Sequence, residues 1–172
     1  MENPVARPVT RNAFRDAMAR VCAPVNIITT NGKAGRGGFT ATAVCSVTDE
    51  PPTVLVCMNS NSAQTALFLE NRRFCVNVLS GDHMDLAGFF AGREADMGER
   101  YAAAEWVDLA SGNQALADAI VSFDCRLKEA RRVGTHNVML GEVVNIRTRT
   151  DGQALLYFER KFLPVSAPQA IA

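Results

Sequence analysis

The sequence lacks an excess of charge of either sign. Its 172 residues contain 18 Lys+Arg and 18 Asp+Glu, so the formal net charge at pH 7 is zero. A protein that wraps nucleic acid neutralises phosphates and normally carries a basic excess, so we set nucleic-acid binding aside. Hydrophobic residues make up 48% and charged residues 21% of the chain, as in globular proteins. These proportions exclude a disordered or collagen-like chain.

Long hydrophobic runs are also missing. The longest apolar stretches, such as residues 53–58, are far too short to span a bilayer, so we expect no membrane association. Residues 1–11 contain prolines and arginines but no apolar run, and we therefore expect no secretory signal and a cytoplasmic protein. The length fits one domain. We expect that domain to span residues 1–172, with residues 1–10 as a flexible arm.

The cysteines and histidines form no metal-binding or disulfide pattern. The five cysteines are odd in number and include no C-x-x-C, which argues against a disulfide framework and a zinc site. Each has apolar neighbours, so we expect small buried thiols in a reducing cytoplasm; they are Cys22, Cys45, Cys57, Cys75 and Cys125. The only histidines, His83 and His136, cannot build a multi-histidine centre within one chain, and we expect no metal.

Several common catalytic motifs are absent. The glycines between residues 32 and 38 do not form G-x-G-x-x-G and lead into a strand, so a Rossmann dinucleotide site is not supported. The sequence also has no G-x-x-x-x-G-K-[ST], H-E-x-x-H or G-x-S-x-G. These absences remove the commonest kinase, metalloprotease and hydrolase assignments.

Strand-like segments outnumber helical ones. A first helix is expected to begin after Thr10, its cap, and to end at Pro24. A second is expected over residues 63–70 with Ser62 as its cap, and a third over residues 82–91, where His83 would be a solvated residue of the first turn. Strands are expected at residues 25–30, 39–47, 53–58, 74–79, 121–127, 138–146 and 154–158.

The strand pattern favours a β-rich α+β domain. Residues 53–58 are typical of a fully buried central strand, whereas residues 92–113 are polar and irregular, with Trp106 as the expected anchor. Sheet edges expose unpaired backbone groups, and a closed barrel would hide them. We therefore expect a barrel with a few peripheral helices.

Residues 38–47 are the most informative segment. They form a strand of small and hydroxyl residues, which lets a flat ligand lie against the backbone while hydroxyl and N–H groups bond its edge. Residues 59–62 (Asn-Ser-Asn-Ser) follow a buried strand and open a helix, whose N-terminus suits a phosphate. Each feature alone is more often a plain strand or a helix cap. Together they indicate a nucleotide-like cofactor.

Two further segments have both structural and functional interpretations. His136 follows a glycine and a threonine at the entry to a strand; alone it is more often structural, but beside a redox cofactor it would donate a hydrogen bond or transfer a proton. Residues 89–93 place an aromatic pair beside a glycine and an arginine, which suits a helix C-terminus or a cofactor cover. Both interpretations stay open here.

These segments resemble the short-chain NAD(P)H:flavin oxidoreductases. The similarity runs in order, without large gaps, from about Phe14 to Pro164. It is carried by FRDAM from residue 14, VNIITT from residue 25, residues 38–47, PP at residue 51, FCVNVL from residue 74, FAG from residue 90, GTH from residue 134 and LLYF from residue 155. The same scaffold includes the flavin reductase components of two-component monooxygenases, such as 4-hydroxyphenylacetate 3-monooxygenase, and the corrin reductase of cobalamin synthesis.

The resemblance implies a split β-barrel that binds FMN or FAD, and a homodimer with cofactor sites near the subunit interface. Residues expected along the isoalloxazine edge are Thr40, Ala41, Thr42 and Ala43. Residues expected by the ribityl chain and phosphate are Cys57, Asn59, Ser60 and Ser62, and those at the nucleotide end are Phe90, Ala91 and Gly92. His136 would be the catalytic residue by the nicotinamide pocket, and Tyr157 matches an aromatic position near the site. Such proteins vary over residues 93–100, which leaves the roles of Arg93 and Arg100 open.

We interpret the chain as an NAD(P)H:flavin oxidoreductase, in which NADH or NADPH passes a hydride to bound flavin and the reduced flavin serves a partner monooxygenase. One alternative is a corrin reductase that reduces cob(II)yrinic acid a,c-diamide by single electrons. An alternative of another class is a non-catalytic flavin-binding module, which would bind flavin without consuming NADH. The choices between NADH and NADPH, and between FMN and FAD, stay open at this stage.

Overall fold

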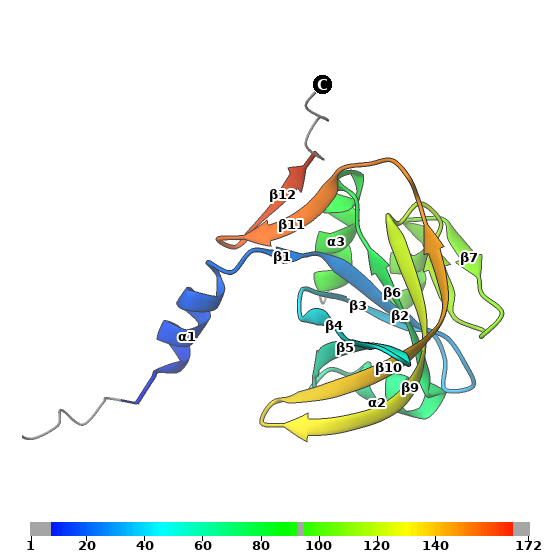
Figure 1. The fold of residues 1–172 in the computed structure, drawn as a ribbon, viewed down its shortest axis with the longest axis horizontal. Coiled ribbons are helices and arrows are strands. Elements are labelled where there is room, and N and C mark those ends of the chain that lie inside the picture. The colour runs from blue at the N-terminus through cyan, green and yellow to red at the C-terminus, as the bar shows by residue number, and fades with distance from the viewer. Residues whose placement is uncertain (1–7, 93–94, 167–172) are drawn as a thin grey trace, which may run out of the picture.

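The computed structural model describes residues 8–92 and 95–166. This part of the chain forms three antiparallel sheets (Figure 1). The largest has the strand order β3-β2-β6-β9-β10-β5-β4. Its strands are β2 (Asn26–Thr30), β3 (Gly37–Ala41), β4 (Val44–Asp49), β5 (Pro52–Asn59), β6 (Arg73–Val78), β9 (Val121–Val133) and β10 (His136–Thr148). The smaller sheets contain β1 (Ala23–Pro24), β11 (Ala154–Phe158) and β12 (Lys161–Val165), and β7 (Trp106–Asp108) with β8 (Gln114–Leu116).

The seven-stranded sheet curls without closing. Its edge strands, β3 and β4, are consecutive in the sequence and are linked through Thr42 and Ala43. β3 also contacts β5, so the two ends of the sheet approach each other. The β-rich α+β class is confirmed, whereas the closed barrel expected from the strand count is not formed by the described strands. The result is an incomplete barrel, in agreement with the split β-barrel that the resemblance implies.

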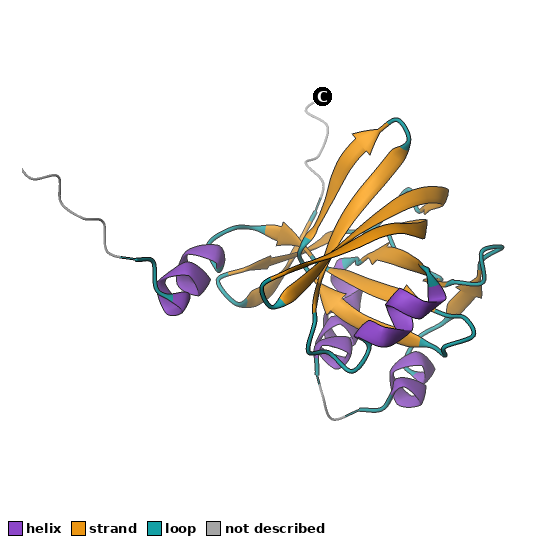
Figure 2. Cartoon of the chain, turned by 90° about the horizontal axis from the view of Figure 1, so that it is seen from below, coloured by secondary structure: helices purple, strands orange, loops and turns teal. Residues whose placement is uncertain are grey.

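Short helices cover part of this barrel. They are α1 (Arg11–Met18), α2 (Thr65–Asn71), the 3-10 helix η1 (Gly81–His83), α3 (Met84–Ala91) and α4 (Met97–Ala102). Figure 2 shows most of them gathered on one side of the strands, while α1 stands apart. The Thr10 hydroxyl caps α1 as expected, accepting a hydrogen bond from the N–H of Ala13 (3.2 Å). None of the described helices is long and apolar enough to cross a bilayer.

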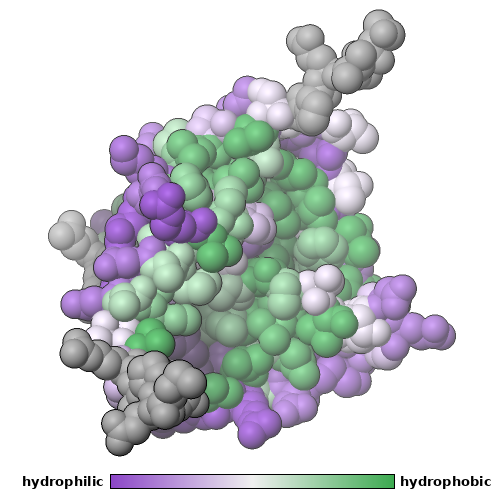
Figure 3. Space-filling view, turned by 60° about the vertical axis from the view of Figure 1, so that its left-hand side comes forward, coloured by the Kyte–Doolittle hydropathy of each residue, from purple (hydrophilic) through white to green (hydrophobic). Residues whose placement is uncertain are grey.

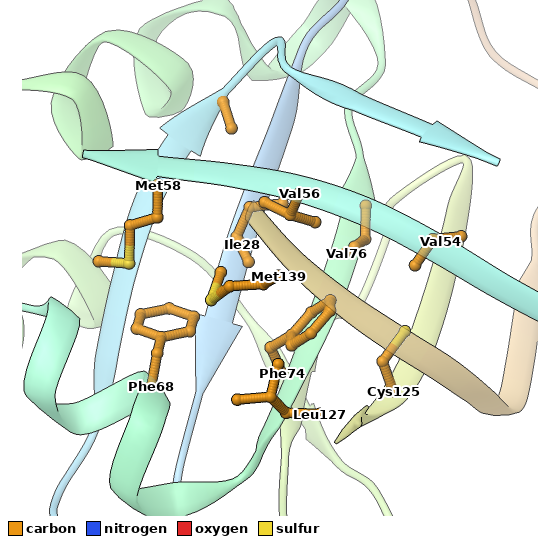
Figure 4. Close-up of a cluster of buried hydrophobic side chains, with 11 residues drawn as sticks. Ile28, Val54, Val56, Met58, Phe68, Phe74, Val76, Cys125, Leu127 and Met139 are labelled. Carbon is orange, nitrogen blue, oxygen red and sulfur yellow. The ribbon is translucent and has the colours of Figure 1, made fainter. Parts of the chain in front are cut away.

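The buried apolar side chains form two clusters. The first fills the barrel: Val56 and Met58 of β5 meet Phe68 of α2, Phe74 of β6 and Met139 of β10 (Figure 4). The second lies between α3, α4 and the smaller sheets, and its members include Leu79, Ala87, Phe90, Tyr101, Leu116 and Leu155. The inward residues of β5 thus belong to the barrel core, and its alternate residues lie on the outer face of the sheet.

A buried asparagine, Asn77 on β6, ties four strands together. Its Oδ1 accepts hydrogen bonds from the N–H of Leu116 on β8 (2.8 Å) and the hydroxyl of Ser122 on β9 (3.0 Å). Its Nδ2 donates to the carbonyl of Ile27 (3.0 Å) and to the hydroxyl of Thr29 (3.3 Å), both on β2. Both amide hydrogens and the oxygen are thus paired, which a fully buried polar group requires.

Several expected element boundaries are wrong. The strand expected over residues 39–47 is interrupted at residues 42–43, so it forms β3 and β4. β5 alternates buried and more exposed residues and lies next to the edge strand β4, so it is not a fully buried central strand. The first helix ends at Met18 because packing of β1 on β11 takes Pro24 into a strand. Residues 92–113 include α4 and β7, and Trp106 does anchor them, donating from Nε1 to the carbonyl of Tyr101 (2.9 Å).

His83 and three of the cysteines also differ from expectation. His83 is buried: its Nδ1 accepts a hydrogen bond from the N–H of Ser80 (3.0 Å) and its Nε2 lies 2.9 Å from Asp118. Only two cysteines are buried, Cys75 and Cys125, whereas Cys57 is half-buried and Cys22 and Cys45 are exposed. Cys45 lies on the edge strand β4 and Cys22 follows α1, so apolar neighbours in the sequence do not bury either of them.

Replacing Asn77 with leucine should destabilise the fold strongly. The change keeps the approximate volume but leaves the Leu116 N–H and the Ser122 hydroxyl hydrogen without their acceptor, and each buried unpaired group costs about 1–3 kcal/mol. We expect the free energy of unfolding, measured by urea denaturation at fixed protein concentration, to fall by about 2–5 kcal/mol. The matched control Asn12→Leu, on the exposed surface of α1, should change it by no more than about 0.5 kcal/mol. Equal stability of the two variants would contradict this role of Asn77.

Candidate functional site

The end of β5 and the start of β10 bring together two segments that are distant in the sequence. Asn59, the last residue of β5, lies opposite His136, the first residue of β10. The N–H and the hydroxyl of Ser60 both donate to the carbonyl oxygen of Thr135, each at 3.0 Å. Gly134 supplies the left-handed backbone (φ 56°) in the turn that precedes β10. Three of the expected site residues thus meet at one place.

The strand register places these side chains on the outer face of the sheet. Successive residues of a strand point to opposite faces. Val56 and Met58 are buried in the barrel core (Figure 4). Cys57 and Asn59 therefore point outward, and His136, the partner of Asn59, shares their face. Cys57 is half-buried there, whereas Asn59 and His136 are exposed.

The break between β3 and β4 forms the other side of the candidate site. The carbonyl of Ala43 accepts a hydrogen bond from the N–H of Cys57 (3.0 Å), which sets the break beside β5. Thr42 is half-buried and Ala43 is exposed. Thr40 instead donates its hydroxyl hydrogen to a carbonyl of α3 (2.6 Å), and Ala41 belongs to the barrel core. Of the four residues expected along a ring edge, Thr42 and Ala43 therefore offer free surface.

The helix expected to begin after Ser62 begins at Thr65 instead. Residues 60–64 form turns, in which the Ser62 hydroxyl accepts a hydrogen bond from the N–H of Gln64 (3.3 Å) and the Asn59 side chain accepts one from the N–H two residues later (2.9 Å). These bonds use N–H groups that a helix start would have offered to a phosphate. The Ser62 hydroxyl hydrogen has no acceptor among the described residues and stays available to an anionic group.

The residues at the end of α3 differ in exposure. The Phe90 ring is buried against Tyr101, with centroids 5.8 Å apart. It also packs on Gly38 of β3, where a Cβ atom would lie 2.7 Å from the ring. The Phe90 ring thus supports β3 from the side of α3, and Ala91 and Gly92 are the members of this segment that are exposed. Their contact with a nucleotide stays a prediction.

Arg100 holds this segment in place. Its guanidinium is buried and donates to the carbonyls of Phe90 (3.1 Å), Gly92 (2.6 Å) and Ala95 (3.2 Å). These bonds give Arg100 a structural role. Arg93 lies outside the described residues.

Tyr157 lies on a different sheet from the group at β5 and β10. On β11 it pairs with Ala23 of β1, and its half-buried ring packs on Phe162, with centroids 5.5 Å apart, and on the second core cluster. Its place near the site stays a prediction.

The outer face contains few titratable groups. Burial raises the pKa of the Cys57 thiol, and the neighbouring Cys45 thiol adds to the rise, so Cys57 stays neutral at pH 7. His136 Nδ1 lies 3.0 Å from the hydroxyl of Thr135, which leaves Nε2 free to face a ligand. A surface of small and hydroxyl residues around Thr42, Ala43, Ser60 and Ser62 suits a planar heteroaromatic ring with a polar chain, so the residues present fit a flavin.

Two residues of this face were not predicted from the sequence. Thr135 accepts both hydrogen bonds of Ser60 and contacts the His136 ring. Arg131 of β9 lies opposite Val138 of β10, and the alternation places this exposed cation on the face of His136. Both residues lie in or beside the β9–β10 hairpin, whose strands are longer than the strands that alternation predicts. Their neighbours follow from the register of that hairpin, which the sequence pattern does not give.

The chain is similar to proteins of one class along most of its length. A family model described as "Flavin reductase like domain" matches residues 18–166. The FMN reductase (NADH) RutF of Pantoea ananatis is 48% identical over 157 residues, which cover 91% of this chain and 82% of that protein. The 4-hydroxyphenylacetate 3-monooxygenase reductase component of Pseudomonas aeruginosa is 45% identical over 163 residues, which cover 94% and 96% of the two chains.

Solved structures agree with these relatives. A Haemophilus somnus protein described as a flavin reductase has a TM-score of 0.88 and 41% identity, covering 91% of this chain and all (100%) of that chain. The NADH:FAD oxidoreductase SgcE6 of Streptomyces globisporus, in complex with NAD and FAD fragments, has a TM-score of 0.85 and 25% identity, covering 96% and 99% of the two chains. The resemblance and the fold class expected from the sequence are confirmed.

Enlarging Ala43 should weaken flavin binding. A leucine at this exposed position would occupy the gap between β3 and β4, where a flat ring must approach the backbone, and such overpacking costs about 1–3 kcal/mol. We expect the Kd for FMN, measured by fluorescence quenching, to rise about tenfold or more. Ala130→Leu, also exposed but on β9 away from the break, is the matched control and should bind FMN like the wild type. Equal affinity of the two variants would remove residues 42–43 from the site.

Proposed function

The chain belongs to the flavin reductase like family, and we propose that it is an NADH-dependent flavin reductase that reduces FMN or FAD and supplies reduced flavin to a partner monooxygenase. The observation that carries this proposal is the meeting of Asn59 and Ser60 with His136, beside the break at residues 42–43. A relative named FMN reductase (NADH) supports NADH as the electron donor. A relative named as the reductase component of a monooxygenase supports the delivery of reduced flavin to an oxygenase.

The proposed site residues have separate tasks in binding. Thr42 and Ala43 leave space for the flavin ring beside the backbone, and the neutral Cys57 thiol packs near it. Asn59 and Ser60 lie where the ribityl chain would run, and the free hydroxyl hydrogen of Ser62 would bond the phosphate. Arg131 would add a positive charge for the phosphates of flavin or nucleotide.

His136 would position the nicotinamide. Its Nε2 is free and would hydrogen-bond the carboxamide, while the hydroxyl of Thr135 at Nδ1 orients the imidazole. When bound, the flavin supplies the redox chemistry by accepting a hydride from NADH. Orienting the nicotinamide against the flavin would lower the barrier by up to roughly 7–11 kcal/mol, so the chain would need no strong acid or base. This agrees with the scarcity of titratable groups on the face.

We further propose a homodimer. The sheet keeps two open edges, β3 and β4, and open edges favour association unless they are covered. Exposed apolar side chains lie on β4, β10 and β12; they are Val47, Val144, Ile146, Leu163 and Val165. Two copies related by a twofold axis would cover these surfaces.

Steady-state assays test the proposed reaction. We expect the purified chain to consume NADH only when FMN or FAD is added, with saturation in both nucleotide and flavin and with a lower kcat/KM for NADPH. Turnover with a corrinoid acceptor but none with free flavin would instead establish the corrin reductase. Saturable flavin binding without NADH consumption would establish a non-catalytic module, and either result overturns the proposal.

His136→Ala should impair the use of NADH more than the binding of flavin. A lost hydrogen bond costs about 0.5–1.5 kcal/mol, so we expect kcat/KM for NADH to fall about three- to tenfold. Flavin affinity should change less than kcat/KM, because Asn59 and Ser60 keep their backbone positions. His83→Ala is the control: it should lower the melting temperature and leave kcat/KM nearly unchanged, since His83 is buried against Ser80 and Asp118. Unchanged kinetics in a stable His136→Ala protein would exclude His136 from the site.

A further inference from the structure

Polar residues of α1 and of the turn after it form hydrogen bonds and ion pairs with the β11–β12 turn of the same chain. Nη2 of Arg160 lies 2.5 Å from Oδ1 of Asp16, and Nη1 of Arg20 lies 3.4 Å from Oε1 of Glu159. The N–H of Glu159 donates to the carbonyl of Ala19 at 2.7 Å. Glu159 and Arg160 connect β11 to β12, so these bonds fasten the helix to a turn of the smaller sheet. Figure 1 shows α1 held outward from the barrel by this attachment.

The other side of α1 is apolar and uncovered. Phe14 and Met18 lie four residues apart on α1 and so share one side of it, and Val21 follows in the turn after the helix; these three residues are called the arm stripe below. Their exposed fractions are 59%, 48% and 53%, and no residue of α1 is buried. A helix of eight residues is marginal in water unless its apolar side is packed. The arm stripe therefore needs a surface to cover it.

A second copy of this chain matches the arm stripe in area and charge. The three half-exposed side chains offer on the order of 250 Å² of apolar surface, about a third of the roughly 800 Å² that each partner contributes to a standard interface. The rest of the chain would supply the remainder, and Figure 3 shows broad apolar surface, hollowed at its centre, on the side from which α1 projects. The zero net charge means that two copies do not repel one another.

We infer that α1 is an exchanged arm, whose stripe packs on the apolar barrel face of a second copy. The inference rests on the homodimer proposed above and adds where its contacts lie. In a twofold dimer each copy would place its arm on the other, so the same contact occurs twice and covers the arm stripe of both copies. The ion pairs of Asp16 and Arg20 with the β11–β12 turn set the direction in which each arm leaves its own barrel.

A pair of charge-adding substitutions on α1 tests the exchanged arm. Phe14→Glu puts a carboxylate into the arm stripe, and Asn12→Glu puts the same charge on the opposite side of the same helix. By light scattering, we expect the wild type and Asn12→Glu to be dimers at micromolar concentration, and the dimer dissociation constant of Phe14→Glu to rise at least tenfold. A Phe14→Glu dimer as tight as that of Asn12→Glu would overturn the arm and leave the homodimer standing. A monomeric wild type would overturn both.

Two further measurements keep the test independent of folding and of activity. In hydrogen exchange on the wild type, the amides of α1 should be protected at high concentration and should lose protection on dilution below the dimer dissociation constant, while those of β6 keep it. Unprotected α1 amides at every concentration would overturn the arm even if Phe14→Glu fails to fold. NADH oxidation by the dimeric Asn12→Glu protein tests the proposed reaction alone. If that protein is still a dimer by light scattering but does not oxidise NADH, the result counts against the proposed reductase activity and not against the exchanged arm.

Discussion

The register between β5 and β10 decides which side chains face the barrel core and which face the candidate site. A slip of one residue in an antiparallel pair turns every side chain to the opposite face. Here the alternation buries Val56 and Met58 and leaves Cys57 and Asn59 outside. Two features hold this register: Gly141 of β10 passes so close to the Phe74 ring that a Cβ would overlap it, and Ser60 bonds Thr135 at the strand ends. Packing the core therefore also assembles the site.

The incomplete closure of the barrel connects the site with assembly. The interruption at residues 42–43 leaves small, accessible residues beside β5, and the same interruption leaves β3 and β4 as edges. Exposed edges and apolar strands are a liability in a lone chain. A dimer with exchanged arms would cover them without filling the barrel opening from within. The polar network of Asn77 keeps the opposite part of the sheet fixed while one side stays open.

The sequence predicts the fold well where local pattern and packing agree. The span of β11 and the Thr10 cap were predicted without error, and β6 to within one residue at each end, because short apolar runs and capping chemistry act over a few residues. The failures have long-range causes. The burial of His83 depends on Asp118, and the meeting of Asn59 with His136 depends on strand pairing across 77 positions of chain (136 − 59).

The residues of the candidate site likewise divide into those that local pattern predicts and those that depend on distant parts of the chain. Thr40 to Ala43 were all expected along the flavin ring, and of these Ala43 is exposed and Thr42 half-buried, so their contact with a ring stays a prediction. Thr40 carries the same type of side chain, but its hydroxyl is bonded to α3, a partner that spacing does not reveal. Thr135 and Arg131 escaped notice because only the register of the hairpin gives them their neighbours.

Arg100 determines how firmly the end of α3 is held. Its buried guanidinium is bonded to three carbonyl oxygens. All three acceptors are backbone oxygens, so the clamp needs no other side chain, and its burial shields its charge from salt. A lysine would be a point charge without the planar fork that reaches three acceptors at once. A single side chain thus holds both ends of the segment from Phe90 to Ala95, so that the loss of Arg100 would release three carbonyl oxygens at once.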